Sequence, residues 1–344
     1  MKTDRASATV PSVFDVRLPA LPYFDPDYQR DPHGMNRRAM MQGPLALGPL
    51  GPEALSYEAV EQVLRDRRFR MPEGLTIEAH GATAGPLQAT PSPLSLDGEE
   101  HQRLRRLASG LFKPSRVAEL QTAMTVVISR LVDVVAGTGW SEVVADIAWP
   151  YAIAINSELL EAPNRQDHDE LKMLLFAVLA GGTETTSTQL AAAVQVFCDH
   201  PAQWALLADR SELAHQAVDE VMRYAPVVLR TLRVAAEDVE LAGVMIPAGT
   251  LVGANTAAAN RDPRIFEEPD RFDILRESPA SALPFGGGMH FCLGAHLAKA
   301  ELAVALAVMA RRMPNMDRTG PAPWKSVIGT SGPIALPVAF EPGH

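Results

Sequence analysis

The sequence is poor in the features of a secreted or membrane-bound protein. Its 344 residues contain only two cysteines, Cys198 and Cys292, which are too few for a disulfide scaffold and fit a reducing cytoplasm. The first residues contain no apolar core of a secretory signal, and no run approaches eighteen apolar residues. We therefore expect a soluble, cytoplasmic protein without a membrane partner.

Other absences narrow the classes of function. The net charge is −10, so binding to nucleic acid through phosphate contacts is not expected. The sequence has neither a low-complexity linker nor an internal repeat, and its 47% hydrophobic content suffices for a large core, so a single domain over residues 1–344 is predicted. No G-x-G-x-x-G motif lies between a strand and a helix, and no cysteine set could hold an iron–sulfur cluster. A redox enzyme of this sequence would need electrons from outside.

The most informative stretch is residues 283–301, LPFGGGMHFCLGAHLAKAE. A glycine-rich loop leads to Cys292, and apolar residues then recur at helical spacing. The free N–H groups at a helix start favour a thiolate, and glycines let the backbone approach a flat, bulky group. These features suit an axial ligand to haem iron. The plainer interpretation is a buried cysteine that acts as a small hydrophobe, as most lone cysteines do.

The neighbours of Cys292 decide between these interpretations. Residues 285–294, FGGGMHFCLG, resemble the F-G-x-G-x-[HR]-x-C-x-G signature of the cytochrome P-450 family, and chance matches to it are rare. The resemblance implies that Cys292 is the metal ligand and that His290 binds a haem propionate. It also implies that Phe285 packs beside the sulfur and that Gly294 belongs to the cofactor-binding loop. The implied fold is mainly α (α+β), with small antiparallel β-sheets.

Three further basic residues are candidates for binding the haem propionates. His101 and Arg105 lie four residues apart in DGEEHQRLRRL, which resembles the H-x-x-x-R helix of the family. A guanidinium fork suits a carboxylate, although an ordinary solvated basic helix face is the plainer interpretation. Arg233 stands where the family places another propionate-binding arginine, and the nearby Arg230 remains an alternative.

A second motif interrupts a long apolar helix predicted over Leu171 to Val196. Two glycines and three threonines in residues 180–186, AGGTETT, are poor choices for a helix centre, so a local opening of the hydrogen-bond ladder is predicted. A helix end with threonine and glutamate caps is the alternative. The motif resembles the family's [AG]-G-x-[DE]-T, which implies that Glu184 and Thr185 relay protons during oxygen activation.

The family's E-x-x-R pair is the third motif. Glu220 and Arg223 lie three residues apart and resemble it, with Arg271 as the implied third member of a structural ion pair. A surface pair of little energetic value is the plainer alternative.

The remaining local predictions concern secondary structure. They are an irregular segment over 1–33, a helix over 57–65 after the N-cap Ser56, a loop over 71–96, a helix opening at 97–100, helices over 120–135 and 141–160, a helix capped by Ser211, and strands within 230–252.

The chain departs from the family before the AGGTETT motif. Only 17 residues, Asn164 to Ala180, lie between Pro163 and Gly181, whereas a loop and two helices need roughly 30. The lid helices over the substrate pocket are therefore predicted to be absent between about 163 and 171. The covering would then be the 71–96 loop, a second copy of the chain, or a large carrier-bound substrate.

The resemblance implies a haem-thiolate monooxygenase that activates O2 to oxidise a small organic or carrier-bound substrate. Its cofactor would be haem b, with electrons from NAD(P)H through a ferredoxin and a ferredoxin reductase. The alternatives are a peroxide-driven or non-oxygenating haem enzyme with an open pocket, and a non-catalytic auxiliary protein. The presence of Cys292, Glu184 and Thr185 argues against the auxiliary role, which would place no chemical demand on them.

Overall fold

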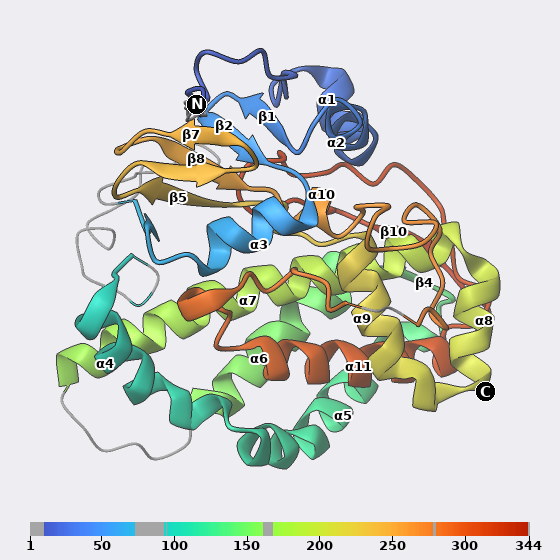
Figure 1. Cartoon of the computed structure of the whole chain (residues 1–344). Helices are drawn as coiled ribbons and strands as arrows, with labels where there is room; N and C mark the ends of the chain where they lie inside the picture. Colours follow the sequence, from blue (N-terminus) through green and yellow to red (C-terminus); the bar gives the residue numbers. More distant parts are fainter. Residues whose placement is uncertain (1–9, 73–92, 94, 161–167, 278–279, 343–344) are drawn as a thin grey trace, which may run out of the picture.

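Helices form the bulk of the molecule, the largest sheet lies at its upper left, and a smaller sheet lies at its right (Figure 1). The computed structural model describes residues 10–72, 93, 95–160, 168–277 and 280–342. Within these ranges, no helix is both long and apolar enough to cross a bilayer. The arrangement confirms the predicted mainly α fold with small sheets.

Four helices make the centre of the helical part: α5 (Pro114–Ala136), α6 (Trp149–Leu160), α7 (His168–Asp199) and α11 (Ala295–Arg312). α11 packs against α5 and α7, and α6 packs against the same two helices. The burial of each aliphatic side chain contributes about 1.5–3 kcal/mol. On α5 the buried residues recur at every third or fourth position: Val117, Leu120, Met124, Ile128, Val132 and Val135.

Shorter helices surround this centre. The buried face of α9 packs against α11, whereas α3 packs against the strands. These helices are α1 (Pro26–Arg30), α2 (Pro32–Met40), α3 (Tyr57–Arg65), α4 (Gly98–Ser109), α8 (Pro201–Asp209), α9 (Ala214–Tyr224) and α10 (Thr256–Ala259). Short 3-10 helices are η2 (Gly110–Phe112), η4 (Ser211–Leu213) and η5 (Gly288–His290), and η3 (Val144–Ala148) is a π-helix.

The strands form three small sheets. The largest has the order β1-β2-β8-β5-β3; its β2–β8 pair is parallel and its other pairs are antiparallel. A second sheet has the order β4-β10-β9, and β6 pairs with β7. The strands are β1 (Leu45–Gly48), β2 (Gly51–Ala54), β3 (Phe69–Arg70), β4 (Trp140–Glu142), β5 (Thr231–Ala235), β6 (Val239–Leu241), β7 (Val244–Ile246), β8 (Leu251–Ala254), β9 (Asp317–Arg318) and β10 (Pro337–Ala339).

Helix starts explain where the local predictions succeed and fail in the N-terminal part. The helix over 57–65 is confirmed, since Ser56 accepts a hydrogen bond from the Ala59 N–H. The prediction of an irregular segment over 1–33 is wrong for α1 and the start of α2. Both helices have an aspartate cap, Asp25 or Asp31, followed by a proline at the first position, and this combination starts a helix.

Two further predictions about helix starts are also corrected. The helix predicted over 141–160 begins only after β4, because Ser141 pairs with Val338 in the sheet. Ser211 opens the one-turn helix η4 rather than capping α9, and its side chain makes no capping hydrogen bond. The helix predicted to open at 97–100 is confirmed as α4, and the strands predicted within 230–252 are confirmed as β5 to β8.

The predicted opening of α7 at its glycine pair is wrong. α7 is a continuous α-helix through residues 180–186, and its packing against α6 and α11 outweighs the low helix propensity of the glycines and threonines. Residues 168–171 of the predicted lid gap already belong to α7, and 161–167 lie outside the described residues. The loop predicted over 71–96 also lies mostly outside them.

Candidate active site

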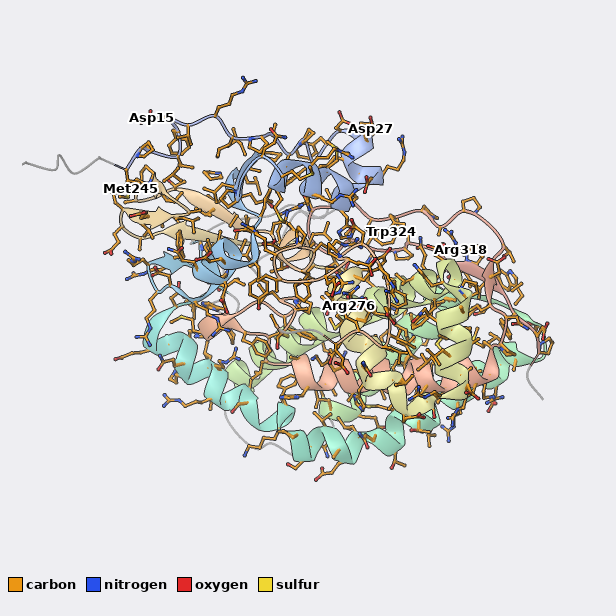
Figure 2. The ribbon with its side chains drawn as sticks, turned by 45° about the vertical axis from the view of Figure 1, so that its right-hand side comes forward. Asp15, Asp27, Met245, Arg276, Arg318 and Trp324 are labelled. Carbon is orange, nitrogen blue, oxygen red and sulfur yellow. The ribbon has the colours of Figure 1, made fainter. Side chains whose placement is uncertain are left out.

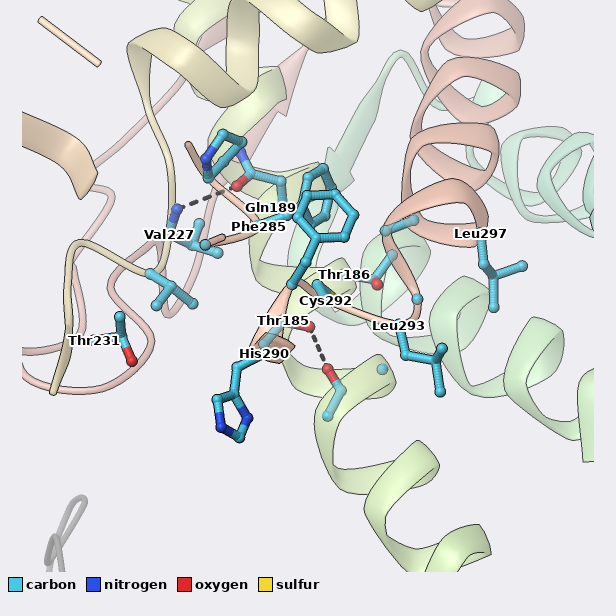
Figure 3. A pocket seen from close by; sticks show the side chains of 18 of the residues that line it. Thr185, Thr186, Gln189, Val227, Thr231, Phe285, His290, Cys292, Leu293 and Leu297 are labelled. Carbon is cyan, nitrogen blue, oxygen red and sulfur yellow. Dashed lines mark hydrogen bonds between the residues drawn. The ribbon is translucent and has the colours of Figure 1, made fainter. Parts of the chain in front are cut away.

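A cavity of about 430 Å³ lies between α4, α7, the start of β5 and the loop before α11. This volume is within the range of small-molecule and cofactor sites. Figure 3 shows Phe285, His290 and Cys292 of the loop together with Thr185 and Thr186 of α7. The cavity therefore brings together two of the three motifs that the sequence singles out.

The loop presents Cys292 to this cavity. The backbone N–H of Cys292 donates to the Phe285 carbonyl at 3.0 Å, and the residue is exposed on the cavity side. Gly288 has a φ of 64°, and a Cβ there would lie 2.4 Å from the Leu64 carbonyl oxygen, so only glycine fits. The glycines therefore allow the loop to pack closely against α3, with the Cys292 sulfur facing the cavity.

In the protein alone, burial opposes the expected preference of Cys292 for a thiolate. Burial by the surrounding protein raises the pKa of the Cys292 thiol, although the cavity reaches its sulfur. The Gly294 N–H and the Arg105 charge lower this pKa, but burial outweighs them. A bound metal ion would remove the proton, because a coordinating thiol is deprotonated.

Phe285 and Gly294 flank the sulfur in the cavity wall. The Phe285 ring is partly buried, with its centroid 6.3 Å from that of Phe291. A Cβ on Gly294 would lie 3.6 Å from the Phe112 ring and 4.0 Å from the Cys292 Sγ, which is ordinary contact. Gly294 therefore leaves room beside the sulfur without being required by a clash.

His101 and His290 lie together at one side of the cavity. Their ring centroids are 4.4 Å apart, and the His290 Nε2 lies 2.7 Å from the Asp97 Oδ1. His101 is 1% exposed, and neither of its ring nitrogens has a hydrogen-bond partner within the described part of the chain. Burial lowers the pKa of both rings, and the Asp97 contact opposes this for His290. A buried imidazole that has no partner among the described residues needs an explanation, and a bound anionic group would provide one.

Arg105 and Arg233 add two guanidinium groups that line the cavity. The Arg105 Nη2 donates to the Phe291 carbonyl at 2.6 Å. Arg233 is 3% exposed, and its Nη1 donates to the Thr231 hydroxyl and the Leu232 carbonyl. Among the described residues its Nε and Nη2 have no hydrogen-bond partner, and no carboxylate pairs with it. Burial lowers the pKa of Arg233.

The alternative Arg230 differs, because it is already paired. Its Nε lies 2.7 Å from the Glu53 carboxylate, and it also donates to Tyr28 Oη and the Val327 carbonyl. Of the two arginines, Arg233 is thus the one with free donors. We call His101, Arg105 and Arg233 the open basic cluster.

These residues fit an iron porphyrin with two propionates. His101 and Arg233 of the open basic cluster are buried, and no carboxylate among the described residues pairs with any of its three side chains, although Asp97 pairs with the adjacent His290; such unpaired donors suit a dianionic edge. Cys292 adds a soft sulfur ligand on the same cavity. A buried cation without a partner is costly, so a bound anion accounts for the arrangement better than the protein alone.

Glu184 and Thr185 point in different directions from α7. Thr185 lines the cavity, and its hydroxyl donates to the Gly181 carbonyl one turn earlier. The Glu184 carboxylate lies outside the lining, half exposed, with its Oε1 2.9 Å from the Lys325 Nζ. Only one of the two predicted relay residues therefore faces the cavity.

The E-x-x-R pair lies apart from the cavity and is buried. Arg223 uses all five of its N–H donors: two on the Glu220 carboxylate, at 2.7 and 2.8 Å, and three on the carbonyls of Asn260, Pro269 and Arg271. The third side chain of the cluster is that of Arg276, whose Nε lies 3.1 Å from the Glu220 carboxylate. Figure 2 labels Arg276. We call Glu220, Arg223 and Arg276 the closed arginine cluster.

The prediction of Arg271 as the third member is therefore wrong for its side chain. That side chain is 61% exposed and pairs with Glu268 and Asp273 at the surface. Only the Arg271 carbonyl belongs to the cluster. The motif identified the right segment of the chain, but the Arg271 side chain points to the surface and does not reach Glu220.

Sequence reasoning missed three polar residues in the cavity wall: Asn156, Gln189 and Glu301. Gln189 donates to the Ala225 carbonyl and accepts from the Val227 N–H, which joins α7 to the segment after α9. Glu301 carried a usable signal, because it is an acid within the apolar repeat of α11. Asn156 carried none beyond its place in a helix.

A cysteine facing a cavity beside unpaired basic side chains, in a mainly helical chain, is the arrangement of haem-thiolate proteins. The sequence pattern of the family described as Cytochrome P450 matches residues 195–313. Luteothin monooxygenase of Streptomyces thioluteus is 32% identical over 401 aligned positions, which cover 96% of this chain and 98% of that protein. The chain belongs to the cytochrome P-450 family, and it is a haem-thiolate monooxygenase of that family.

Other relatives agree with this assignment. Nocardicin C N-oxygenase of Nocardia uniformis subsp. tsuyamanensis is 31% identical and matches 83% of this chain and 88% of its own length. The solved structure of P-450BioI with an acyl carrier protein carrying hexadec-9Z-enoic acid has a TM-score of 0.81 at 26% identity, over 92% of this chain and 100% of that one. The 401 aligned positions exceed the 344 residues of this chain, so at least 57 of them are filled by the Streptomyces protein alone.

Proposed function

We propose that Cys292 ligates the iron of haem b and that His101, Arg105, Arg233 and His290 hold its propionates. The observation that carries this proposal is that the buried His101 and Arg233 have no carboxylate partner among the described residues and lie, with the partly exposed Arg105, near an accessible sulfur. The bound haem supplies the activation of O2, and a cysteine ligand favours O–O cleavage. Phe285 and Gly294 shape the wall around the sulfur.

The chain's own residues then manage protons and water. The Thr185 hydroxyl lines the cavity and can hand a proton to a water molecule there. Glu184 lies at the surface beside Lys325, where it can take up protons from solvent. We propose that the two act in sequence, Glu184 as the entry point and Thr185 as the last protein donor.

The substrate is proposed to be a small organic molecule of secondary metabolism, free or attached to a carrier. The names of two relatives, luteothin monooxygenase and nocardicin C N-oxygenase, support a small organic molecule as the substrate. The solved complex of P-450BioI with a carrier protein supports a carrier-bound substrate. A carrier or a second copy of the chain would also cover the pocket in place of lid helices.

Electrons are proposed to come from NAD(P)H through a ferredoxin and its reductase. The chain is acidic overall, but the exposed Arg65 of α3, which pairs with Glu61, lies beside the cysteine loop, and Arg106 of α4 is also exposed. Exposed arginines of this kind can attract an acidic partner and speed its docking in a salt-dependent way. Arg65→Glu with Arg106→Glu should slow reduction at low salt and converge with the parent at high salt.

The reduced carbon monoxide difference spectrum tests the central assignment. Cys292→Ala should lose the thiolate-type Soret band, because Cys198, the other cysteine, is buried away from the cavity. Cys198→Ala is the matched control and should retain the band. Loss of the band in the control and its retention in Cys292→Ala would refute the ligand assignment.

Replacement of the cavity hydroxyl tests the proton relay. Thr185→Ala should keep haem content and divert reducing equivalents to hydrogen peroxide, because the hydroxyl acts only after oxygen has bound. Thr185→Ser is the control, since it restores the hydroxyl. Equal product per NAD(P)H in Thr185→Ala and the parent would contradict the relay and would favour a reaction that bypasses oxygen activation.

A further inference from the structure

A buried ion pair lies at the wall of the cavity, just before β5. Arg230 belongs to this wall together with its neighbour Thr231, which Figure 3 labels. The Arg230 side chain is 8% exposed, and its Nε lies 2.7 Å from the Oε1 of Glu53, whose side chain is 2% exposed. Burial opposes the charge of Arg230, but Glu53 and two tyrosines more than offset this effect, so the pKa of Arg230 is raised. The pair therefore holds two opposite charges and has no net charge.

The surroundings of the pair hold the carboxylate in place. The Tyr23 hydroxyl donates to the Glu53 Oε2, and the Asn255 Nδ2 donates to the Oε1 at 3.3 Å. A Cβ on Gly253 would lie 2.6 Å from the Glu53 Cγ, so this glycine leaves the room that the glutamate occupies. The Tyr23 ring also covers one face of the Arg230 guanidinium, with the Cζ 3.9 Å from the ring centroid. The Glu53 carboxylate is thus fixed beside Arg230 by three donors and by packing.

Two N–H groups of Arg230 remain available. The Nη1 donates to the Val327 carbonyl at 2.9 Å, and the Nη2 donates to the Tyr28 hydroxyl at 3.0 Å. Each guanidinium nitrogen of Arg230 therefore has one protein acceptor. A guanidinium has five N–H groups, two of them on each Nη, so one N–H on each Nη has no acceptor among the described residues. Buried donors normally find a partner, and the cavity gives a ligand access to Arg230.

The net charge of the pair decides which partner suits these two N–H groups. A carboxylate would bring a second negative charge close to the buried Glu53, and like charges repel strongly in an interior of low dielectric constant. A carbonyl, ether or hydroxyl oxygen accepts the same hydrogen bonds and adds no charge. Arg233 differs, because it has no carboxylate partner within the described ranges and therefore suits an anion.

We infer that Arg230 binds an uncharged oxygen acceptor of the substrate, and that Glu53 is a positioning residue that acts through Arg230 to exclude carboxylates. The substrate class is then an uncharged molecule with a carbonyl or similar oxygen, such as a ketone, an amide or an ester. A few polar groups in the wall of a pocket fix the orientation of a ligand, so this contact sets which part of the substrate faces the haem. The inference rests on the proposed function and deepens it, since it names the substrate class.

Imidazoles with a tail test this inference without turnover. An imidazole nitrogen binds ferric haem and shifts the Soret band, so optical titration of the holoenzyme gives the Kd. The probes are 1-alkylimidazoles of increasing tail length that end in an acetyl, a carboxylate or an isopropyl group, three ends of similar shape. At the tail length that the acetyl probe prefers, the parent should bind this probe about tenfold more tightly than either of the other two. Tighter binding of the carboxylate probe than of the acetyl probe would overturn the inference.

Glu53→Gln separates the effect of charge from that of an apolar pocket. The variant keeps the shape of the side chain beside Arg230 but removes the negative charge. The carboxylate probe should therefore bind about tenfold more tightly than to the parent, whereas the acetyl probe should change little. Glu58→Gln replaces an exposed glutamate on α3 and is the matched control, which should change neither Kd. An unchanged ratio of the two Kd values in Glu53→Gln would contradict the role of Glu53.

A double variant keeps the test decisive if Glu53→Gln does not fold. Glu53→Gln with Arg230→Met leaves no unpaired charge in the interior. The acetyl probe should lose its advantage over the isopropyl probe, which should bind as it does to the parent. A persisting advantage would refute the role of Arg230. The reduced carbon monoxide spectrum separates the two levels: absence of the thiolate-type band in the parent would refute both proposals, and a normal band with a persisting advantage would refute this inference alone.

Discussion

Two arginines in the interior, Arg223 and Arg233, have opposite surroundings. Arg223 uses every N–H donor on protein acceptors and binds a buried carboxylate through two of them. Arg233 is buried to a similar degree, at 3% against 2% exposed, yet within the described ranges it has no carboxylate partner. Arg223 belongs to the closed arginine cluster, in which the charges are paired with one another. Arg233 belongs to the open basic cluster, which has no carboxylate partner among the described residues.

This difference indicates that Arg223 stabilises the fold, whereas Arg233 is available to bind a ligand. Burial alone does not distinguish them, since both are shielded from solvent. The number of hydrogen-bonded donors distinguishes the two arginines, because a buried charge is stable only when it is paired. Arg230 supports this criterion: it lines the cavity like Arg233, but Glu53 already neutralises it.

The largest expected effect is loss of the closed arginine cluster. Arg223→Met leaves the buried Glu220 with Arg276 as its one remaining cationic partner among the described residues, and breaking such a pair costs about 3–5 kcal/mol. Urea unfolding should show this loss with and without haem. A loss that disappears when haem is removed would place Arg223 in the cofactor site and would break the comparison.

The open basic cluster should respond with opposite signs in the two states. Arg233→Met should weaken haem binding by about 2 kcal/mol or more, which is about 30-fold, because a propionate loses its partner. The haem-free protein should be equally or more stable, since a buried unpaired charge is removed. Haem transfer to a haem-free globin and urea unfolding measure the two effects.

Arg230→Met is the matched control for that prediction. It lies three residues away and is also buried, but it pairs with Glu53. It should therefore destabilise the haem-free protein as well. Equal behaviour of the two variants would mean that their surroundings do not separate their roles.

A smaller effect concerns His33, near the closed arginine cluster. Burial and the charges of Arg261 and Arg223 lower its pKa to about 3, although part of the residue reaches solvent. The unfolded chain, with a pKa of about 6.5, binds the proton first, so stability falls as pH drops from about 6.5 toward 3. The slope should stay below about 1.4 kcal/mol per pH unit.

Comparison of variants isolates this contribution. His33→Gln should flatten the fall in stability between pH 6.5 and 4, measured by urea unfolding. His215→Gln replaces an exposed histidine and should leave the curve unchanged. Parallel curves for the parent and His33→Gln would show that His33 becomes charged without cost.

The smallest effect is expected at Arg271. Its exposed side chain can be removed without loss, because only its backbone carbonyl accepts from Arg223. Arg271→Ala should leave the urea midpoint within error, whereas Arg276→Ala should lower it. A lower urea midpoint for Arg271→Ala than for Arg276→Ala would support Arg271 as the third member of the cluster, as the motif suggested.

Local sequence determined much of this protein. Ser56, Asp25 and Asp31 cap helices through bonds to neighbours a few residues away, so such starts can be found from sequence. The glycine-rich loop places the sulfur of Cys292 in the cavity for a similar reason, since only glycine fits its backbone against Leu64. The family resemblance named the cysteine, the basic residues and Thr185, all in or beside one cavity.

Only the tertiary structure decided which of these groups are satisfied. Arg230 and Arg233 are alike in the sequence, and a carboxylate from β2, far away in the chain, separates them. The glycine pair of α7 stays helical because α6 and α11 pack on both sides, while its missing Cβ makes room beside Asn156. Partners brought from distant segments set burial, pairing and protonation, and no local pattern encodes them.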